Sequence, residues 1–571
     1  MEESGMKLTF PAIFRETVRK YGKRDALAFA GEEPLSYESV NRTVGSLMAH
    51  LGRHGITAGD RVAILGNNMP NWGITYYAIT FMGAVAVPVL PDFSNTEVAN
   101  VLEHSEAKAI VISASMQGKI EEIRSEYLRT AILMDDFSVI FSGTDAPAQF
   151  DPDALPANSY EPDEEDLASI IYTSGTTGRS KGVMLTHRNI CFNALKGKKI
   201  QPLDENDKFL SVLPLSHTYE NTLGLILPML CGSCVYYLRK PPTPAVLLPA
   251  LEEIRPSVML TVPLIIEKIY FNRILPAFNG KPLIKLLYRI PAVRRKLNAV
   301  AGKKLMVTFG GNLRFFGIGG AKLNRTVEKF LLEAKFPYAI GYGLTETAPL
   351  LAGANPQRSV FESTGPAIEG IELRINDPDP RTGEGEIWAR GPSVMKGYYK
   401  EPELTAQFLT PDGWFKTGDL GLQDISGNLY IKGRLKNMIV GASGENIYPE
   451  EIESVINSFR YVVESLVIQQ KGRLVALVHL NMEELERKYL HLKQEVQDRY
   501  DEKRHEIREM MDDKRHDLQD RFEEKKEQIL SELKEYVNSH VNKFSRIHSV
   551  KLQPLPFQKT ATMKIKRFLY T

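Results

Sequence analysis

The sequence has few cysteines, almost no net charge and no uninterrupted apolar run long enough to cross a membrane. Three cysteines in 571 residues argue against a disulfide-bonded secreted protein and favour a reducing compartment. A formal net charge of +1 gives no overall attraction to nucleic acid. The best apolar candidate, 223–238, is interrupted by Pro228 and Gly232, and the N-terminus shows no apolar core of a secretion signal. We therefore expect a cytoplasmic protein.

Two of the cysteines, Cys231 and Cys234, have the C-x-x-C spacing of redox motifs. The surrounding residues are apolar, and a strand pattern follows at 235–238. We interpret the pair as small residues that pack beside this strand, because buried cysteine behaves as a small apolar side chain.

One stretch, SIIYTSGTTGRSKGVMLTH at 169–187, combines small hydroxyl residues, glycines and a lysine directly after an apolar run. Residues 170–172 are typical of the end of a buried strand. The following residues, 173–178, offer backbone N–H groups and hydroxyls that can surround an anion, and Lys181 adds a positive charge. A polyphosphate is the natural ligand, although Ser180 stands where the Walker loop needs glycine. The alternative is a plain Ser/Thr/Gly turn.

The length predicts several domain-sized units. Up to about residue 350, buried strand patterns alternate with amphipathic helix patterns, which indicates doubly wound α/β sheets with helices on both faces. The expected strands are 61–65, 85–89, 109–113, 209–213, 233–238 and 314–318.

The character of the chain changes after about residue 365. Short strand patterns divided by Gly, Pro and Asp predict a β-rich part over 365–432, which completes a large domain at 1–432. A hinge is expected at 433–437, followed by a small α+β domain over 438–571. The expected strands of the β-rich part are 371–375, 386–390 and 428–431.

From 481 to 553 the chain has neither glycine nor proline. Charged residues dominate this segment and apolar ones recur every three or four positions, which predicts a long helical arm at about 483–541. The flanking strands, 474–480 and 549–552, are expected to share one small sheet, so the arm should be an antiparallel helical hairpin that turns near Asp512 and Asp513. The arm is either a solvated extension or a surface for self-association or for docking a carrier protein.

Five further stretches carry ordered motifs. Each alone is compatible with a turn, a charged surface or a basic tail. They are GYGLTET at 341–347, WFKTGDLG at 414–421, GRLKN at 433–437, GASGENIYPE at 441–450 and KTATMKIKR at 559–567.

Together with the loop at 173–181, these motifs resemble the adenylate-forming superfamily of acyl-CoA synthetases, luciferases and peptide-synthetase adenylation domains. The resemblance spans about 10–567, apart from the helical arm. Three additional stretches, PLSH at 214–217, FGGNLRFF at 309–316 and MKGYY at 395–399, are similar to those of bacterial-type long-chain fatty acyl-CoA synthetases.

The resemblance implies a site for ATP and Mg²⁺. Lys181 and the hairpin loop would hold the β- and γ-phosphates, and small residues from two other loops would enclose adenine. The phosphate loop comprises Thr173, Ser174, Gly175, Thr176, Thr177 and Gly178. The adenine loops comprise Gly319, Gly320 and Ala321 together with Gly341, Tyr342 and Gly343.

Four more residues complete this implied site. Thr345 would touch the α-phosphate, and Glu346 would bind Mg²⁺, a hard cation that prefers oxygen ligands. Asp419 would accept hydrogen bonds from both ribose hydroxyls, a role that suits a bidentate acceptor, and Arg434 would reinforce that contact.

The reaction implied by the resemblance has two halves. The acid first attacks ATP to give an acyl-adenylate and pyrophosphate, and Lys564 would stabilise the developing charge. The thiol of coenzyme A then displaces AMP. His217 would lie near the carboxylate and the thiol entrance, unless it is a structural loop histidine.

The resemblance also implies that the small domain turns about Lys436 between the two halves. This motion would bring Ser443 and Gly444 to the pantetheine tunnel. Asn437 and Met563 depart from the usual pattern, and Lys559 and Lys566 are the alternatives to Lys564 as the catalytic lysine.

A basic segment at 281–304 contains leucines, isoleucines and valines between its charges. It is either a solvated helical face or a contact with an anionic membrane surface, which would place the protein peripherally at the inner face of the membrane. Its basic residues are Lys281, Lys285, Arg289, Arg294, Arg295, Lys296, Lys303 and Lys304.

The leading hypothesis is therefore an ATP-dependent ligase that joins a medium- to long-chain fatty acid to coenzyme A. One alternative retains adenylation but loads the acyl group onto a carrier-protein phosphopantetheine. The other is a non-catalytic scaffold with a synthetase fold. Retention of Lys181, Glu346, Asp419, Arg434 and Lys564 argues against the scaffold.

Overall fold

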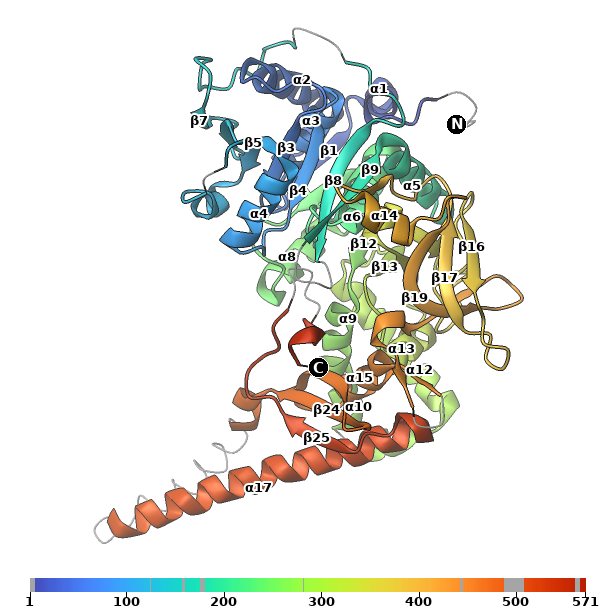
Figure 1. Ribbon diagram of the computed structural model, residues 1–571. Coiled ribbons are helices and arrows are strands. Elements are labelled where there is room, and N and C mark those ends of the chain that lie inside the picture. Colours follow the sequence, from blue (N-terminus) through green and yellow to red (C-terminus); the bar gives the residue numbers. More distant parts are fainter. Residues whose placement is uncertain are drawn as a thin grey trace. The chain divides into compact units, whose positions relative to one another are not determined.

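The computed structural model (Figure 1) describes residues 6–123, 125–156, 160–174, 180–280, 282–441, 445–486, 508–559 and 565–570. Its contacts divide the chain into two compact units. The larger consists of Met1–Thr417 with Gly421–Ile431, and the smaller of Gly418–Leu420 with Lys432–Thr571.

Two sheets, each with eight strands among the described residues, form the frame of the larger unit. In the first sheet, the six strands from β14 to β1 run parallel, and antiparallel strands β15 and β2 close its two ends. The strands, in spatial order, are β15 (Leu350–Gly353), β14 (Tyr338–Gly343), β13 (Phe315–Ile318), β12 (Val258–Thr261), β10 (Lys208–Leu210), β11 (Cys234–Tyr237), β1 (Asp25–Phe29) and β2 (Leu35–Ser36).

The second sheet has a parallel centre with antiparallel strands at both ends. Its strands, in spatial order, are β18 (Gly397–Tyr398), β9 (Ser180–Thr186), β8 (Leu167–Ser174), β4 (Val85–Val89), β3 (Arg61–Leu65), β5 (Ala107–Ile112), β6 (Thr130–Leu133) and β7 (Val139–Ser142). Together the two sheets confirm the α/β class expected from the sequence.

Helix α3 (Pro70–Phe81) contacts β1 of the first sheet as well as β3 and β4 of the second. All but one of its residues are buried, and a helix that is apolar all round has to be covered on every side. It therefore forms the core between the sheets, where Tyr77 stacks on Phe14 of α1 (Phe10–Tyr21) with ring centroids 4.9 Å apart.

The remaining helices of the larger unit cover the sheets or connect their strands (Figure 1). They are α2 (Tyr37–Arg53), α4 (Asn95–Ser105), α5 (His187–Ile200), α6 (Thr218–Glu220), α7 (Leu227–Cys231), α8 (Pro244–Ile254), α9 (Pro263–Ile269), α10 (Leu275–Asn279), α11 (Pro282–Leu287), α12 (Pro291–Thr308), α13 (Arg325–Ala334) and α14 (Pro402–Phe408).

A sheet of four described strands makes up the β-rich part. Its order is β16 (Glu372–Asn376), β17 (Gly385–Arg390), β19 (Phe415–Gln423) and β20 (Leu429–Arg434). Strand β20 leads directly into the smaller unit.

The smaller unit has its own core. Helix α15 (Pro449–Asn457) and part of α17 (Arg508–His540) pack on a sheet of β23 (Val462–Gln470), β24 (Arg473–Leu480) and β25 (Ser549–Leu552). A hairpin of β21 (Ile439–Val440) and β22 (Asn446–Ile447) precedes them. Strands β24 and β25 are parallel neighbours, which confirms that the segments flanking the arm share one sheet.

The turn expected near Asp512 and Asp513 was wrong, because α17 passes through both residues without a break. Aspartate carries only a small helix penalty, and the neighbours Met510, Met511 and Lys514 favour a helix. The first half of the expected hairpin, at 487–507, lies outside the described residues.

The cysteines behave as expected from their apolar surroundings. Cys231 and Cys234 are buried and not disulfide-bonded, and burial raises the pKa of each thiol to about 12. Cys234 begins β11. The C-x-x-C spacing is therefore a packing feature.

Among the helices that the structure describes, none has both the length and the apolar character required to cross a bilayer.

We expect a pH dependence of stability from His187, which begins α5 and is fully buried. Burial lowers the pKa of His187 to about 4, so between about pH 6.5 and 4 the unfolded chain binds the proton and the folded chain does not. By itself, His187 should cost the folded state up to about 3 kcal/mol as the pH falls through this window.

All three tryptophans lie in the larger unit, so their fluorescence during urea unfolding can report this loss. His187→Gln should flatten the dependence of the unfolding free energy on pH, even if the variant is less stable at pH 8. An equally steep dependence in the variant would rule out His187 as its source.

Candidate active site

The stretch expected to bind phosphates forms a hairpin of β8 and β9. Thr173 pairs with Lys181 and Ser174 with Ser180, so the two strands hold both ends of the loop. The loop residues Gly175, Thr176, Thr177 and Gly178 lie outside the described residues.

Tyr398 connects this hairpin to the Glu346 turn. The Lys181 ammonium lies over the Tyr398 ring, 5.2 Å from its centroid, and the Tyr398 hydroxyl donates a 3.0 Å hydrogen bond to Glu346 Oε1. The pairing of β18 with β9 brings Tyr398 opposite Val183. The expected phosphate and Mg²⁺ residues therefore lie on one connected set of contacts. The MKGYY motif pointed to this region, but its role at the site was not foreseen.

The glycines of the expected adenine loops lie at the carboxyl ends of neighbouring parallel strands: Gly319 and Gly320 follow β13, and Gly341 and Gly343 are in the last part of β14. Ile318 of β13 pairs with Ile340 of β14, which places Gly319 and Gly341 side by side at the carboxyl ends of these strands. A Cβ on Gly319 would lie 3.2 Å from the Tyr219 ring, and one on Gly343 would lie 1.8 Å from Pro349 O. Gly343 therefore has no room for a side chain, and at Gly319 the Tyr219 ring would have to shift by a few tenths of an ångström.

Two residues of the first loop, Gly320 and Ala321, are more open. Gly320 has a φ of +83° and is exposed, as is Ala321. Tyr342 is buried beside the turn that contains Thr345 and Glu346, both of which are partly exposed.

Asn193 of α5 anchors that turn. Its side-chain amide donates to Leu350 O at 2.8 Å and to Thr347 O at 3.3 Å, and its Oδ1 accepts from Leu350 N at 3.1 Å. Asn193 is fully buried. Nothing in the sequence marked this residue, because the contact joins positions about 155 residues apart.

His217 lies in a loop after β10, at the same edge of the first sheet. Its backbone N–H donates to Pro214 O at 2.9 Å, and its carbonyl accepts from Asn221 N at 2.8 Å. Its side chain is partly exposed. The loop therefore holds His217 beside the carboxyl edge that carries Gly319 and Gly341.

A buried polar network supports this loop and was also missed. Asn68 Nδ2 donates to Leu213 O at 2.6 Å and to Ser211 Oγ at 2.9 Å, and Ser211 Oγ donates to Glu220 Oε1 at 2.6 Å. Glu220 is fully buried, and burial raises the pKa of its carboxyl to about 8. Its position three residues after His217 is the signal that could have identified it.

An apolar cavity of about 60 Å³ lies at this edge, within the larger unit. Its lining includes Gly341 and Tyr219 near the edge and Leu223, Leu227 and Gly197 further along. No charged residue lines it among those the structure describes. The chemistry of the lining suits an apolar chain.

The expected ribose residues form an ion pair within the smaller unit. Arg434 Nε lies 2.7 Å from Asp419 Oδ1, and the Asp419 side chain is almost fully buried. Lys436 follows in the turn directly after β20 and is exposed, and the neighbouring Asn437 donates to Glu450 Oε1 at 2.6 Å.

Three expected residues of the smaller unit, Ser443, Gly444 and Lys564, lie outside the described residues. The ends of their loops are described. Gly441 N donates to Glu445 O at 2.8 Å, and Lys559 forms an antiparallel bridge with Ile565. Lys559 is also ion-paired with Glu464, which makes it a poor alternative to Lys564.

Glu346 is the only expected metal ligand. In the described part of the chain no cluster of three His, Cys, Asp or Glu side chains could hold a metal. Mg²⁺, however, is commonly bound by one or two carboxylates together with substrate phosphates. The Glu346 carboxylate is partly exposed, and it forms no ion pair with a described residue, so it fits that role.

Curated relatives match most of the chain. The long-chain-fatty-acid–[acyl-carrier-protein] ligase AEE15 of Arabidopsis thaliana is 30% identical, covering 84% of this chain and 77% of its own. The long-chain-fatty-acid–CoA ligase FadD15 of Mycobacterium bovis is 31% identical over 76% of this chain and 75% of its own.

Solved structures agree on the fold. ATP-bound MatB from Rhodopseudomonas palustris matches with a TM-score of 0.74 at 24% identity, over 99% of this chain and 98% of its own. The MenE o-succinylbenzoate CoA synthetase of Bacillus subtilis, bound to its acyl-adenylate, matches with a TM-score of 0.72 at 22% identity, over 98% of each chain.

A family model described as "AMP-binding enzyme" matches residues 14–399. These matches confirm the resemblance drawn from the motifs. The chain belongs to the AMP-binding enzyme family.

Proposed function

We propose that this protein ligates a medium- to long-chain fatty acid to coenzyme A through an acyl-AMP intermediate, with release of pyrophosphate and AMP. The observation that carries this proposal is the apolar cavity, whose lining includes Gly341 of the expected adenine loop. An acid held there has the part of its apolar chain nearest the carboxylate in the protein and the carboxylate itself at the nucleotide. The fatty-acid ligases among the relatives support the same substrate class.

In the first half-reaction, the substrate carboxylate attacks the α-phosphorus of ATP and pyrophosphate leaves. Lys181 and the hairpin loop hold the β- and γ-phosphates, so they stabilise the charge that develops on the leaving group. Thr345 contacts the α-phosphate, and Lys564 stabilises its equatorial oxygens. Glu346 would hold Mg²⁺, which would supply further neutralisation of the phosphate charge.

In the second half-reaction, the thiol of coenzyme A attacks the acyl carbon, its proton passes to solvent, and AMP leaves. The acyl–phosphate anhydride is already a reactive acyl donor, so no nucleophilic side chain is required. The small unit turns about Lys436, which withdraws Lys564 and brings Ser443 and Gly444 to the pantetheine. Asp419 and Arg434 hold the ribose, and His217 lies at the thiol entrance.

A second candidate function is transfer of the acyl group to a carrier-protein phosphopantetheine. The first relative described above is an acyl-carrier-protein ligase, and the arm at 483–541 offers a surface for such a partner or for self-association. Both functions share the adenylation step and differ in the accepting thiol.

We propose a cytoplasmic location. All three cysteines are buried and free of disulfides, which fits a reducing compartment. The proposed reaction also requires ATP and coenzyme A in the compartment where the protein is located.

We expect ATP- and Mg²⁺-dependent pyrophosphate release with fatty acids of graded length, and an acyl-CoA product when coenzyme A is present. Lys564→Ala should slow acyl-AMP formation by at least about a hundredfold. The variant should still convert added acyl-AMP to acyl-CoA, because Lys564 acts only in the first half-reaction.

Lys566→Ala tests the remaining alternative: it should retain both half-reactions, and loss of adenylation in this variant but not in Lys564→Ala would make Lys566 the catalytic lysine. An acyl-AMP product that persists with coenzyme A but transfers to a phosphopantetheinylated carrier protein would favour the second candidate. No pyrophosphate release with any acid would refute adenylation altogether.

Tyr398→Phe should weaken the apparent affinity for Mg²⁺ by about tenfold, because the residues that orient a metal ligand commonly affect metal affinity by that order. The ring beneath Lys181 remains in this variant, so the KM for ATP at saturating Mg²⁺ should change little. Initial rates over a Mg²⁺ titration measure the effect. Tyr399→Phe is the control, and an equal shift in both variants would contradict a specific role for Tyr398.

Gly197→Val should shift the acyl preference to shorter chains. A Cβ at Gly197 lies 3.1 Å from Leu223, so a larger side chain fills part of the cavity. We expect kcat/KM for the longest substrate to fall at least about tenfold while that for the shortest is retained. Gly52→Val, at a helix glycine with open space around it, is the control. A uniform loss across chain lengths would place the acyl chain elsewhere.

A further inference from the structure

The larger unit contains a long segment in which every charged side chain is positive. Residues 268–327 include thirteen lysines and arginines and no aspartate or glutamate, although the whole chain has a net charge of only +1. This segment contains α11 and α12, neither of which contributes a residue to the site described above.

Helix α12 exposes to solvent a stripe of side chains in which lysines alternate with apolar residues. The exposed residues Ala292, Lys296, Val300, Lys303 and Val307 follow one another at intervals of three or four, the spacing that puts side chains on one face of a helix. Val300 is 56% exposed and Val307 76%.

The opposite face of α12 is packed against the protein. Asn298, Gly302 and Leu305 are buried, and a Cβ at Gly302 would lie 2.4 Å from Ala334 O of α13. The helix is therefore fixed in orientation, and its basic and aliphatic stripe must face outward.

Helix α11 and the residues after it, which directly precede α12 in the chain, expose a similar mixture of basic and aliphatic side chains. Leu283 is 68% exposed, Leu286 60% and Ile290 48%, and Lys285 and Arg289 lie among them, also exposed or partly exposed. We call the exposed residues of 282–308 the docking face.

Most charges of the docking face have no partner. Arg294 pairs with Glu333 at 2.8 Å. Six others form no ion pair with any residue that the structure describes: Lys285, Arg289, Arg295, Lys296, Lys303 and Lys304. A purely solvated face would explain the charges but not the large aliphatic side chains exposed between them.

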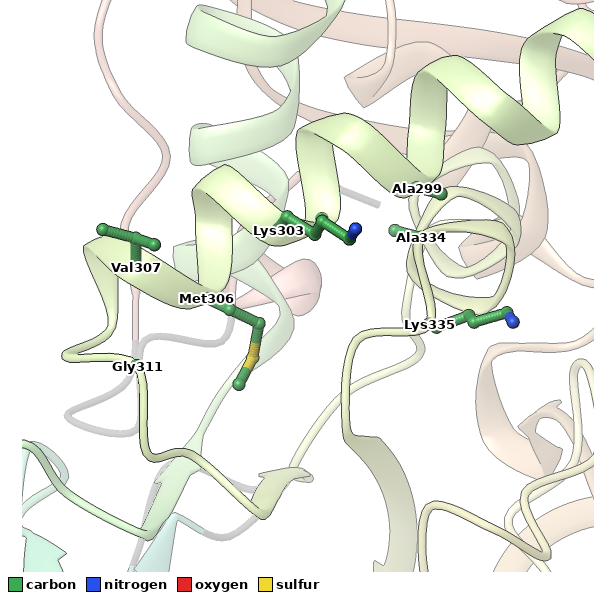
Figure 2. Close-up of a pocket in the computed structure, with 8 residues that line it drawn as sticks. Ala299, Lys303, Met306, Val307, Gly311, Ala334 and Lys335 are labelled. Carbon is green, nitrogen blue, oxygen red and sulfur yellow. The ribbon is translucent and has the colours of Figure 1, made fainter.

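A hollow of about 400 Å³ lies beside the docking face, between α12 and the end of α13 (Figure 2). Ala299, Met306 and Ala334 give it apolar walls, and Lys303 and Lys335 stand at its border. Figure 2 shows Met306 extending from α12 into the open space. Ammonium groups above apolar walls suit the phosphate and glycerol region of a phospholipid.

We propose that the docking face binds the surface of a bilayer that contains anionic phospholipid. The unpaired cations meet the lipid phosphates, and the exposed leucines, isoleucine and valines enter the boundary between headgroups and acyl chains. A nucleic acid would match the charge but leave the aliphatic side chains in water. The proposal is independent of the acyl substrate.

The test is co-sedimentation of the full chain with vesicles of phosphatidylcholine alone or with 30 mol% phosphatidylglycerol, a proportion of about one anionic lipid in three. Binding should require phosphatidylglycerol and weaken as salt is raised. Lys296→Gln with Lys303→Gln should weaken binding by roughly thirtyfold, since each basic residue near such a surface contributes a factor of about five. Val300→Ser with Val307→Ser should weaken it as well.

Lys23→Gln with Arg53→Gln is the matched control, because both residues are exposed cations of the larger unit outside the docking face. It should bind like the unaltered protein, and all variants should keep their pyrophosphate release with a short soluble acid. The proposal is overturned if the unaltered protein binds equally to vesicles with and without phosphatidylglycerol, or if the docking-face and control variants bind equally. It is also overturned if RNA at equal charge competes fully with the vesicles.

Discussion

Parallel strands that end at one edge of a sheet are the constraint on which this site depends. Strands β10, β12, β13 and β14 all run in the same direction, so the segments after them meet at their carboxyl ends. Ligands of open α/β sheets bind at such an edge. Here it collects the His217 loop, Gly319 and Gly341, and the mouth of the apolar cavity.

The second sheet supplies the other half of the site through Tyr398. Its ring lies beneath Lys181 and its hydroxyl holds Glu346, so the phosphate hairpin and the proposed Mg²⁺ ligand are fixed relative to each other. Asn193 holds the same turn from α5. The contacts of Tyr398 therefore join Lys181 and Glu346, the two residues that we propose for binding the phosphates and Mg²⁺.

The sequence predicted much of this arrangement. The expected strands 61–65 and 85–89 coincide with β3 and β4, because short apolar runs with clear borders leave little ambiguity. Lys181 and Glu346 were named as expected site residues because motifs mark them. Asn193, Glu220 and the contact of Tyr398 were not predicted, because these depend on packing between segments far apart in the chain.

The prediction of a turn at 512–513 was wrong for a different reason. Two aspartates were taken as a break in a segment without glycine or proline, although the residues on both sides favour a helix, and α17 continues through them. The hairpin was a topological inference from the two flanking strands, whose shared sheet is confirmed.

The most direct measurement is calorimetric binding of non-hydrolysable acyl-sulfamoyl adenosines, stable mimics of acyl-AMP, with acyl chains of increasing length. One ligand then reports on the nucleotide edge and on the apolar cavity together. If the two are continuous, affinity should exceed that of AMP and rise with chain length until the cavity is full. Affinity equal to that of AMP at every chain length would contradict a shared site.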